Sequence, residues 1–304
     1  DSHYLSAFDS LVIDSEIRDQ EAFAHVKDIQ KSYPVSEDEG EEDNTYLSYN
    51  MVVGEAADIN LSLAFEVLDY ALLSAPGAPL KQALLDAKIG KDIYGSFEDG
   101  IKQTYFSIVA KGANLSQKEE FVKVIRDTLT KIAEEGIDKK AVTAGINYYE
   151  FRFREADFSS YPKGLMYGLD ILSSWLYDDT KPFCEVQLLE GFEFLKKALE
   201  EGYFEDLIRK YLLDNTHGAI LSLVPEKGLA AKRDKELEEK LENYRKSLSD
   251  EELTRMVENT KALEAYQEAE EAPEALTCIP MLSREDIKKE ITGLTNEEHH
   301  VEDS

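Results

Sequence analysis

Residues 46–53 read Tyr-Leu-Ser-Tyr-Asn-Met-Val-Val, a run rich in aromatic, β-branched and large apolar side chains. Such side chains suit a pleated, half-buried surface, so the run predicts a β-strand. Residues 60–73 then place leucine, valine and alanine at the spacing of one helical face. Proline and glycine in residues 74–79 end that helix, and Pro79 fits the first turn of a second helix over 80–87.

The chain downstream continues to alternate between strand and helix patterns. Two antiparallel strands are expected at 93–97 and 104–110, with Glu98-Asp99-Gly100 at the turn between them. A further β-like run, 218–224, ends at Pro225. Between these strands the apolar spacing predicts five helices, at 116–135, 138–155, 163–178, 185–200 and 203–213. This order describes an α+β domain over 45–225, with helices packed on one antiparallel sheet.

The residues before this domain have a different composition. Residues 37–43 carry six acidic side chains around one glycine, which is typical of a mobile linker. Ahead of them lie Leu11-Val-Ile13 and a stretch near Glu21–Gln30 with a helical pattern. We therefore expect 1–44 to be the tail of a preceding domain followed by an acidic linker.

After the domain, residues 226–275 are highly charged and carry a narrow apolar stripe. Ser249 and Glu252 form a capping box that separates two helical patterns. The pattern predicts an antiparallel helical hairpin whose arms pack along one seam. The expected seam residues are Leu237, Leu241, Tyr244, Leu248, Leu253, Met256, Thr260 and Leu263. Pro273 ends the hairpin, and 276–304 would begin a following segment.

The overall composition limits the classes of partner. Net charge is −29, from 63 acidic and 34 basic residues, and this excess repels nucleic acid and anionic lipid. It would attract a cationic peptide, although a solvated acidic surface is the simpler explanation. No apolar run approaches the ~20 residues of a membrane span. Two cysteines, Cys184 and Cys278, are too few for a disulfide framework and favour a reducing compartment.

No catalytic, metal-binding or cofactor-binding residue is predicted. A zinc peptidase needs His-x-x-x-His with an intervening glutamate, or the inverted His-x-x-Glu-His, and the five histidines form neither pattern. The nearest approach is His299-His-Val-Glu-Asp303, where aspartate stands in the place of the second histidine. Gly164-Leu-Met-Tyr-Gly168 lacks the third glycine of a dinucleotide loop and predicts close helix packing instead.

Four other side chains are candidates for chemistry or for plain structure. His217 precedes a strand, so a turn histidine bonded to backbone is expected rather than a ligand. Cys184 has no histidine near it in sequence, so it would be a nucleophile only if the fold supplied a base. Arg152 and Arg154 would either clamp a peptide carboxylate or form an ion pair that fixes the turn at 156–163. We favour the ion pair.

Several stretches agree in order and spacing with one family of peptidases. They are Leu73-Ser-Ala-Pro-Gly-Ala-Pro-Leu80, Phe106-Ser-Ile-Val-Ala-Lys-Gly112, Arg154-Glu-Ala156, Pro162-Lys-Gly-Leu165, Trp175-Leu-Tyr-Asp178 and Phe204-Glu-Asp-Leu-Ile-Arg-Lys-Tyr-Leu-Leu-Asp-Asn215. Together they resemble the presequence-protease branch of the pitrilysin/insulinase-like zinc metallopeptidases. The likeness runs from about residue 40 to 285 and maps onto the second domain and the helical hairpin of those enzymes.

The resemblance implies a structure and a context. Such peptidases look like two halves, each of two homologous α+β domains, which close around a peptide and are joined by a helical hairpin. Their zinc ligands and catalytic glutamate belong to the first domain, and substrate-clamping arginine and tyrosine residues belong to the fourth; neither set has a matching position here. The chain would be a fragment without the zinc-binding domain, and inactive alone.

The resemblance also implies a role and partners. The chain would wall the substrate chamber and hinge the halves of a monomeric, zinc-dependent, peptide-degrading endopeptidase of the cytoplasm or an organelle matrix. Its partners would be the remaining domains and unstructured peptides, with no nucleic acid or membrane. The alternative is a non-catalytic scaffold or peptide-binding protein that retains the peptidase fold.

Overall fold

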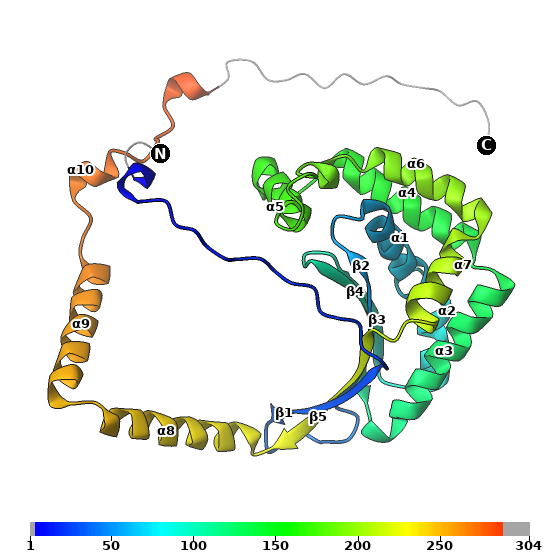
Figure 1. Ribbon diagram of the computed structural model, residues 1–304, viewed down its shortest axis with the longest axis horizontal. Coiled ribbons are helices and arrows are strands. Elements are labelled where there is room, and N and C mark those ends of the chain that lie inside the picture. Colours follow the sequence, from blue (N-terminus) through cyan, green and yellow to red (C-terminus); the bar gives the residue numbers. More distant parts are fainter. Residues whose placement is uncertain (1–3, 288–304) are drawn as a thin grey trace. The chain divides into compact units, whose positions relative to one another are not determined.

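A computed structural model describes residues 4–287 and shows one five-stranded sheet in the order β1-β5-β2-β4-β3. Neighbouring strands are antiparallel except for β1 and β5, which run parallel. Helices α1 to α4, α6 and α7 lie on one side of this sheet, and α5 lies beyond one end of it (Figure 1). The strands are β1 (Lys27–Val35), β2 (Thr45–Glu55), β3 (Asp92–Glu98), β4 (Gln103–Ala113) and β5 (Gly218–Lys227). The predicted α+β class is therefore confirmed.

The helices follow the apolar periodicity of the sequence. They are α1 (Ile59–Asp69), α2 (Pro79–Asp86), α3 (Lys118–Glu135), α4 (Lys139–Glu155), α5 (Lys163–Trp175), α6 (Leu189–Ala198), α7 (Tyr203–Leu207), α8 (Leu229–Ser247), α9 (Asp250–Glu268) and α10 (Pro273–Leu276). Local chemistry fixes their starts. Asp58 accepts a hydrogen bond from the Leu61 amide at the start of α1, Pro79 opens α2, and Asp138 caps α4. Ser249 and Glu252 form the predicted capping box of α9.

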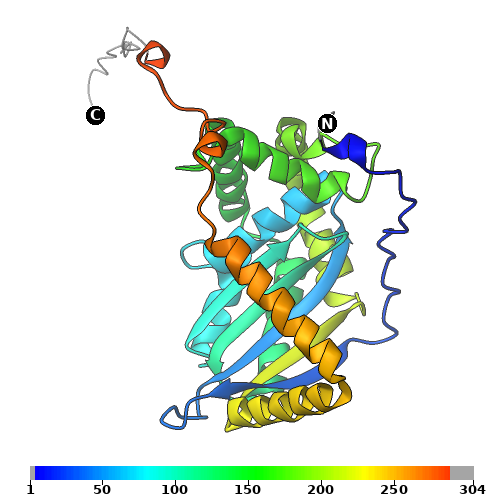
Figure 2. The ribbon, with the colours of Figure 1, turned by 90° about the vertical axis from the view of Figure 1, so that its left-hand side faces the viewer.

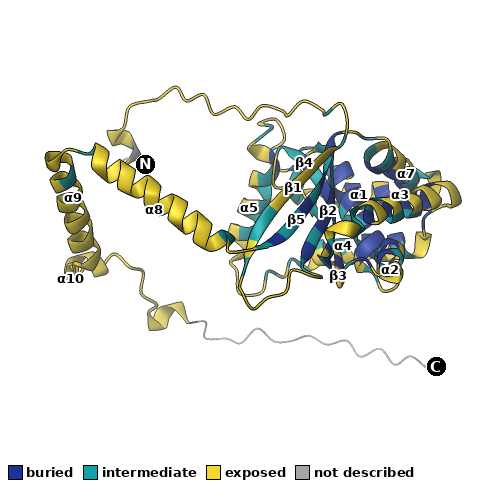
Figure 3. Cartoon of the chain, turned by 90° about the horizontal axis from the view of Figure 1, so that it is seen from below, coloured by how far each residue is buried: buried dark blue, intermediate teal, exposed yellow. Residues whose placement is uncertain are grey.

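The core lies between the helical layer and one face of the sheet. Phe65 and Leu68 on α1 are fully buried against Tyr49 of β2 and Phe106 of β4. Buried residues concentrate there in Figure 3. Each such side chain contributes roughly 1.5–3 kcal/mol by leaving water, so this cluster holds the sheet and helices together.

Strand β1 corrects the prediction for the N-terminal part of the chain. Lys27–Val35 pairs in parallel with β5 along its whole length, and Asp28 forms a 2.6 Å ion pair with Lys118 of α3. The helical pattern near Glu21–Gln30 was therefore misleading, and the prediction that residues 27–44 lie outside the domain is wrong. β1 is an exposed edge strand, so it lacks the alternating apolar signal of a half-buried strand.

The acidic run connects two strands of the same sheet rather than two domains. Residues 37–43 form the turn region between β1 and β2. Asp43 anchors this connection, because its amide and its carboxylate both bond to the Asn114 side chain. The carboxylate also lies 3.5 Å from the Lys91 ammonium group.

The chain divides into two compact units, Asp1–Asp234 and Lys235–Ser304. Helices α8 and α9 occur where two helical arms were predicted, but their antiparallel packing along one seam is not observed. Over residues 235–287 only Leu248 and Leu253, next to the turn, are partly buried. The other expected apolar seam residues stay about half exposed: Leu237, Leu241, Tyr244, Met256 and Leu263. One apolar residue per turn offers too little area to hold two such charged helices together.

Two further predictions concern the glycines of residues 164–168 and the C-terminal segment. A side chain added at Gly164 or Gly168 would meet nothing within 4 Å, so the predicted close packing of these glycines is wrong. The motif His299-His-Val-Glu-Asp303 and most of the segment 276–304 lie outside the described residues.

Candidate functional site

Within residues 4–234 the helical layer covers one face of the sheet and leaves the other face without such a layer (Figure 1). Along β2 the side chains of Leu47, Tyr49 and Met51 point into the core, so Tyr46, Ser48, Asn50 and Val52 point to the opposite face. The register adds residues from the neighbouring strands to this second surface. Val109 lies opposite Ser48, Tyr94 opposite Val109, and Leu221 opposite Ser48. Figure 2 views the sheet from this side; we call the surface the open face.

The open face has a small polar centre whose hydrogen bonds are internal. The Asn50 Nδ2 group donates to Ser48 Oγ at 2.8 Å and to the Ala219 carbonyl at 3.1 Å. Ser107 Oγ donates to Asn50 Oδ1 at 2.6 Å. Around this centre lie half-buried or exposed apolar and aromatic side chains, and Tyr94 is 42% exposed. The surface can therefore contact a polypeptide but presents no nucleophile paired with a base.

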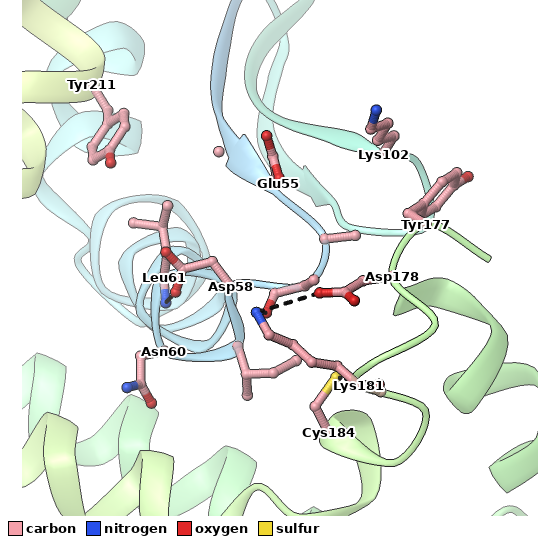
Figure 4. A pocket seen from close by; sticks show the side chains of 14 residues that line it. Glu55, Asp58, Asn60, Leu61, Lys102, Tyr177, Asp178, Lys181, Cys184 and Tyr211 are labelled. Atoms are coloured by element: carbon pink, nitrogen blue, oxygen red, sulfur yellow. Dashed lines mark hydrogen bonds and ion pairs between the residues drawn. The ribbon is translucent and has the colours of Figure 1, made fainter. Parts of the chain in front are cut away.

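A cavity of about 790 Å³ lies at the end of β2 and the start of α1. Figure 4 shows Lys181 reaching across it toward the loop before α1 and pairing with Asp178. The Lys181 ammonium group lies 3.7 Å from the Asp178 carboxylate and donates to the Ala57 carbonyl at 3.3 Å. On the other side, Lys102 pairs with Asp19 at 2.9 Å. Both lysines are thus held by protein groups.

Cys184 lines the same cavity, but nothing activates its thiol. Its Sγ is within hydrogen-bond distance of Ser174 Oγ, at 3.1 Å, and of the Lys181 carbonyl, at 3.3 Å. Within the described chain the two histidines are His25 and His217, and neither lines this cavity. A thiol nucleophile needs an adjacent base or a stabilising charge, so the fold does not provide the base that the sequence left open.

His217 has the structural role that was predicted. The ring is buried, its Nδ1 accepts a hydrogen bond from the Phe23 amide at 3.4 Å, and it packs edge-on against the Phe23 ring at 4.8 Å. Thr216 Oγ1 donates to the Phe23 carbonyl at 2.7 Å. His217 therefore helps to hold the N-terminal segment against the start of β5.

The two arginines after Phe151 form local contacts. Arg154 pairs with Glu150 at 2.6 Å, and Lys196 of α6 lies 2.7 Å from the same carboxylate. The predicted ion pair exists, but it lies within α4 and does not fix the turn at 156–163; the Lys196–Glu150 pair is the one that ties α4 to α6. Arg152 donates to the Tyr148 hydroxyl at 3.2 Å and stacks over its ring at 5.5 Å. Glu150 stands four residues before Arg154, so helical spacing was the signal for this partner.

Neither a metal centre nor a membrane segment is found in the described part of the chain. Across residues 4–287, no group of three or more histidine, cysteine, aspartate or glutamate residues is arranged to hold a metal ion. A catalytic zinc site uses three protein ligands. In the same range no helix has both the length and the apolar character needed to cross a membrane.

Fold and site together define a class: an α+β domain in which residues 4–287 hold no group of side chains arranged as a metal centre. Two family descriptions match the sequence. One is the Peptidase M16 inactive domain, over residues 5–149, and the other is the region associated with subfamily C of the same peptidase family, over residues 223–304. A protease from Helicobacter pylori has a similar fold, with a TM-score of 0.53 at 15% identity over 71% of this chain and 48% of that one.

Comparison with relatives shows which branch of this peptidase family the chain resembles. The chain is 43% identical to Protein HypA of Clostridium perfringens over 98% of its own length and 31% of that protein. It is 33% identical to Presequence protease 1, chloroplastic/mitochondrial, of Arabidopsis thaliana over 97% of its length and 28% of that protein. The chain belongs to the M16 peptidase family, in its presequence-protease branch. It spans less than a third of the length of these relatives.

Proposed function

We propose that this chain is the non-catalytic domain and hinge region of a zinc-dependent endopeptidase that degrades peptides, and that its open face walls the substrate chamber. The observation that carries the proposal is the match to the M16 inactive domain over residues 5–149, the range that contains strands β1 to β4. The zinc would be bound by a domain outside this chain. Alone, the chain would not hydrolyse peptides.

The chemistry of the open face supports a wall for peptides of varied sequence. The Asn50 side chain is hydrogen-bonded to Ser48 and to Ser107. Few polar groups on the open face therefore require a hydrogen bond from a particular peptide side chain. The aromatic and aliphatic side chains around them offer contact area that any extended chain can use. Such a surface binds without strong sequence preference, as degradation of unstructured peptides requires.

The exposed side of α5 supports the presence of partner domains. Leu165, Leu169, Leu172 and Leu176 recur at helical spacing and are each at least 41% exposed. A continuous apolar stripe of this kind marks an interaction surface. We propose that other domains of a longer protein cover it, and that the assembled protein is a monomer of the cytoplasm or an organelle matrix. Helices α8 and α9 would connect its halves, and nucleic acid and membranes would not be partners.

A scaffold or peptide-binding protein with the same fold is the second candidate. It is compatible with the lack of a metal cluster in residues 4–287, which both candidates share. The flanking coding sequence separates the two candidates. A His-x-x-Glu-His motif in a domain ahead of this one indicates the peptidase, and its absence from the whole protein indicates the scaffold.

Steady-state kinetics of the longer protein test the wall. Tyr94→Lys places a charge on the open face, and we expect the KM for an unstructured peptide to rise roughly fivefold to tenfold, equivalent to about 1–1.4 kcal/mol, with kcat less affected. Leu85→Lys is the matched control, because Leu85 is an exposed apolar residue of α2 in the helical layer. Equal effects of the two substitutions, or none from Tyr94→Lys, would contradict the chamber wall.

A further inference from the structure

A second cavity, of about 330 Å³, lies among α1, α4, α5, α6 and the turn Cys184–Val186. Four carboxylates from separate elements line it. They are Glu66 of α1, Asp99 of the β3–β4 turn, Asp170 of α5 and Glu185. The fold thus gathers, around a single small space, acidic residues that are widely separated in the sequence. We call this space the acidic pocket.

These four carboxylates have no ion-pair partner in the described chain. Over residues 4–287, none of their side chains takes part in an ion pair or a hydrogen bond to another side chain. Arg152 is the one basic residue that lines the acidic pocket, and its guanidinium group is bonded to and stacked on Tyr148. A fifth acidic residue, Asp157, accepts a hydrogen bond from the Ser159 amide.

The carboxyl group of Glu66 is the most deeply enclosed of the four. It stands on the helix that forms the centre of the core, yet the acidic pocket keeps part of the residue accessible. Burial, followed by the nearby charges of Asp99 and Glu185, raises the pKa of Glu66 to about 8. Burial and the charges of Asp99 and Asp170 raise the pKa of Glu185 to about 7. Near neutral pH these carboxyl groups therefore hold protons. A cation bound beside them would compensate their negative charge and displace those protons.

Aromatic rings complete the walls. Phe153 packs against Phe192 with ring centroids 6.1 Å apart, and Phe158 meets Tyr167 edge-on at 5.3 Å. Rings beside carboxylates suit a cation carried on an apolar stem, because the ring faces attract the charge and contact the methylene groups. In the described residues that line the acidic pocket, the carboxylates do not converge as metal ligands.

We propose that the acidic pocket binds the guanidinium or ammonium end of an arginine or lysine side chain on a peptide. The volume admits one such side chain, with Glu66 at the floor and Asp99, Asp170 and Glu185 around the entering charge. The identification of the carrier as a peptide rests on the proposed function. Binding by the pocket itself does not, because it needs no cleavage and no other domain.

Calorimetric titration of the 304-residue chain with arginine amide tests the proposal, with citrulline amide as the neutral isostere. We expect one site per chain for arginine amide, at least roughly tenfold weaker binding of citrulline amide, and tighter binding at about pH 8.5 than at about pH 6. Binding near neutral pH should also release protons, seen as a dependence of the measured heat on the ionisation heat of the buffer.

Substitutions of glutamate residues test whether arginine amide binds in the acidic pocket. Glu66→Gln should weaken binding of arginine amide at least roughly tenfold at about pH 8.5. It removes an unpaired enclosed carboxylate, so the variant should fold at least as well as the parent. Glu120→Gln makes the same change on an exposed position of α3 and should leave binding unchanged. Unaltered binding in Glu66→Gln, equal binding of citrulline amide, or displacement of arginine amide by millimolar Ca²⁺ would overturn the proposal. None of these results would touch the role of the open face.

Discussion

The ammonium group of Lys196 on α6 lies 2.7 Å from the carboxylate of Glu150 on α4. Arg154 approaches the same carboxylate at 2.6 Å, so one acidic side chain, only 13% exposed, receives two cations. Hydrogen bonds from Lys196 and from Arg154 lower the pKa of Glu150 below its ordinary value. Helices α4 and α6 are therefore linked by a charged contact beside their apolar one between Phe153 and Phe192.

Removal of that carboxylate charge should destabilise the fold. We expect Glu150→Gln to reduce the free energy of unfolding by about 1–2 kcal/mol, measured by urea denaturation near neutral pH. Glu193→Gln, which removes the more exposed partner of Lys196, should cost less than about 0.5 kcal/mol. A lowered folded-state pKa contributes stability above the unfolded pKa, so the difference for Glu150→Gln should fade as pH drops below about 4. A cost that persists under more acidic conditions would contradict this assignment.

Glu66 should have the opposite pH dependence. Its folded-state pKa of about 8 lies above its ordinary value, so the native state binds the proton more tightly than the unfolded state. The stability that this proton confers is complete at acidic pH and is lost as pH rises through about 8. Glu66→Gln should therefore gain stability over the parent between about pH 6 and pH 8.5, on the order of 1 kcal/mol per pH unit. Parallel stability profiles in urea denaturation would contradict the shift.

Gly218 at the start of β5 should not tolerate a side chain. An added Cβ would collide with the Asn50 carbonyl and the Met51 sulfur on β2. We expect Gly218→Ala to cost about 1–3 kcal/mol in thermal or urea unfolding, because backbone must shift. Gly100→Ala is the matched control, since a Cβ there meets nothing within 4 Å. If both variants unfold at the same midpoint, the close β2–β5 approach is not required.

A charged substitution at Leu241 should have little effect on the stability of this chain. Its side chain is 55% exposed on α8, so Leu241→Asp buries no charge and should change the free energy of unfolding by less than about 0.5 kcal/mol. Leu68→Asp, at a fully buried position of α1, should prevent folding and serves as the positive control in circular dichroism. A large cost at Leu241 would show that the two arms do bury a seam.

Much of the fold could be predicted because its signals are local. The run at 46–53 and the spacing over 60–73 correspond to β2 and to α1 with its π-helical continuation, Tyr70–Ser74. Strand β1 could not be predicted in this way, because its exposed residues carry no periodicity and its partner, β5, lies far away in the sequence. Only the assembled sheet makes Lys27–Val35 a strand.

The candidate sites show the same limit. The ion pair of Arg154 was predicted, but its place was wrong: it was expected to fix the turn at 156–163, and it forms with Glu150 within α4. The acidic pocket has no local signal at all, because Glu66, Asp99, Asp170 and Glu185 come from four elements. The packing of α8 against α9 was predicted wrongly for a different reason. Apolar spacing indicates which residues share one face of a helix, but it does not show whether another surface packs on that face.

The parallel pairing of β1 with β5 has a consequence for biosynthesis. Lys27 lies beside Ala219, so β1 leaves the ribosome long before the strand that holds it exists. Until then the emerging chain can build the β2–β3–β4 sheet and its helices but cannot add its own N-terminal edge. Contacts between residues so distant in sequence form slowly, and a strand whose pairing partner has not yet been synthesised is prone to aggregation. Of the five strands of this sheet, the first to be translated is the last that can take its place.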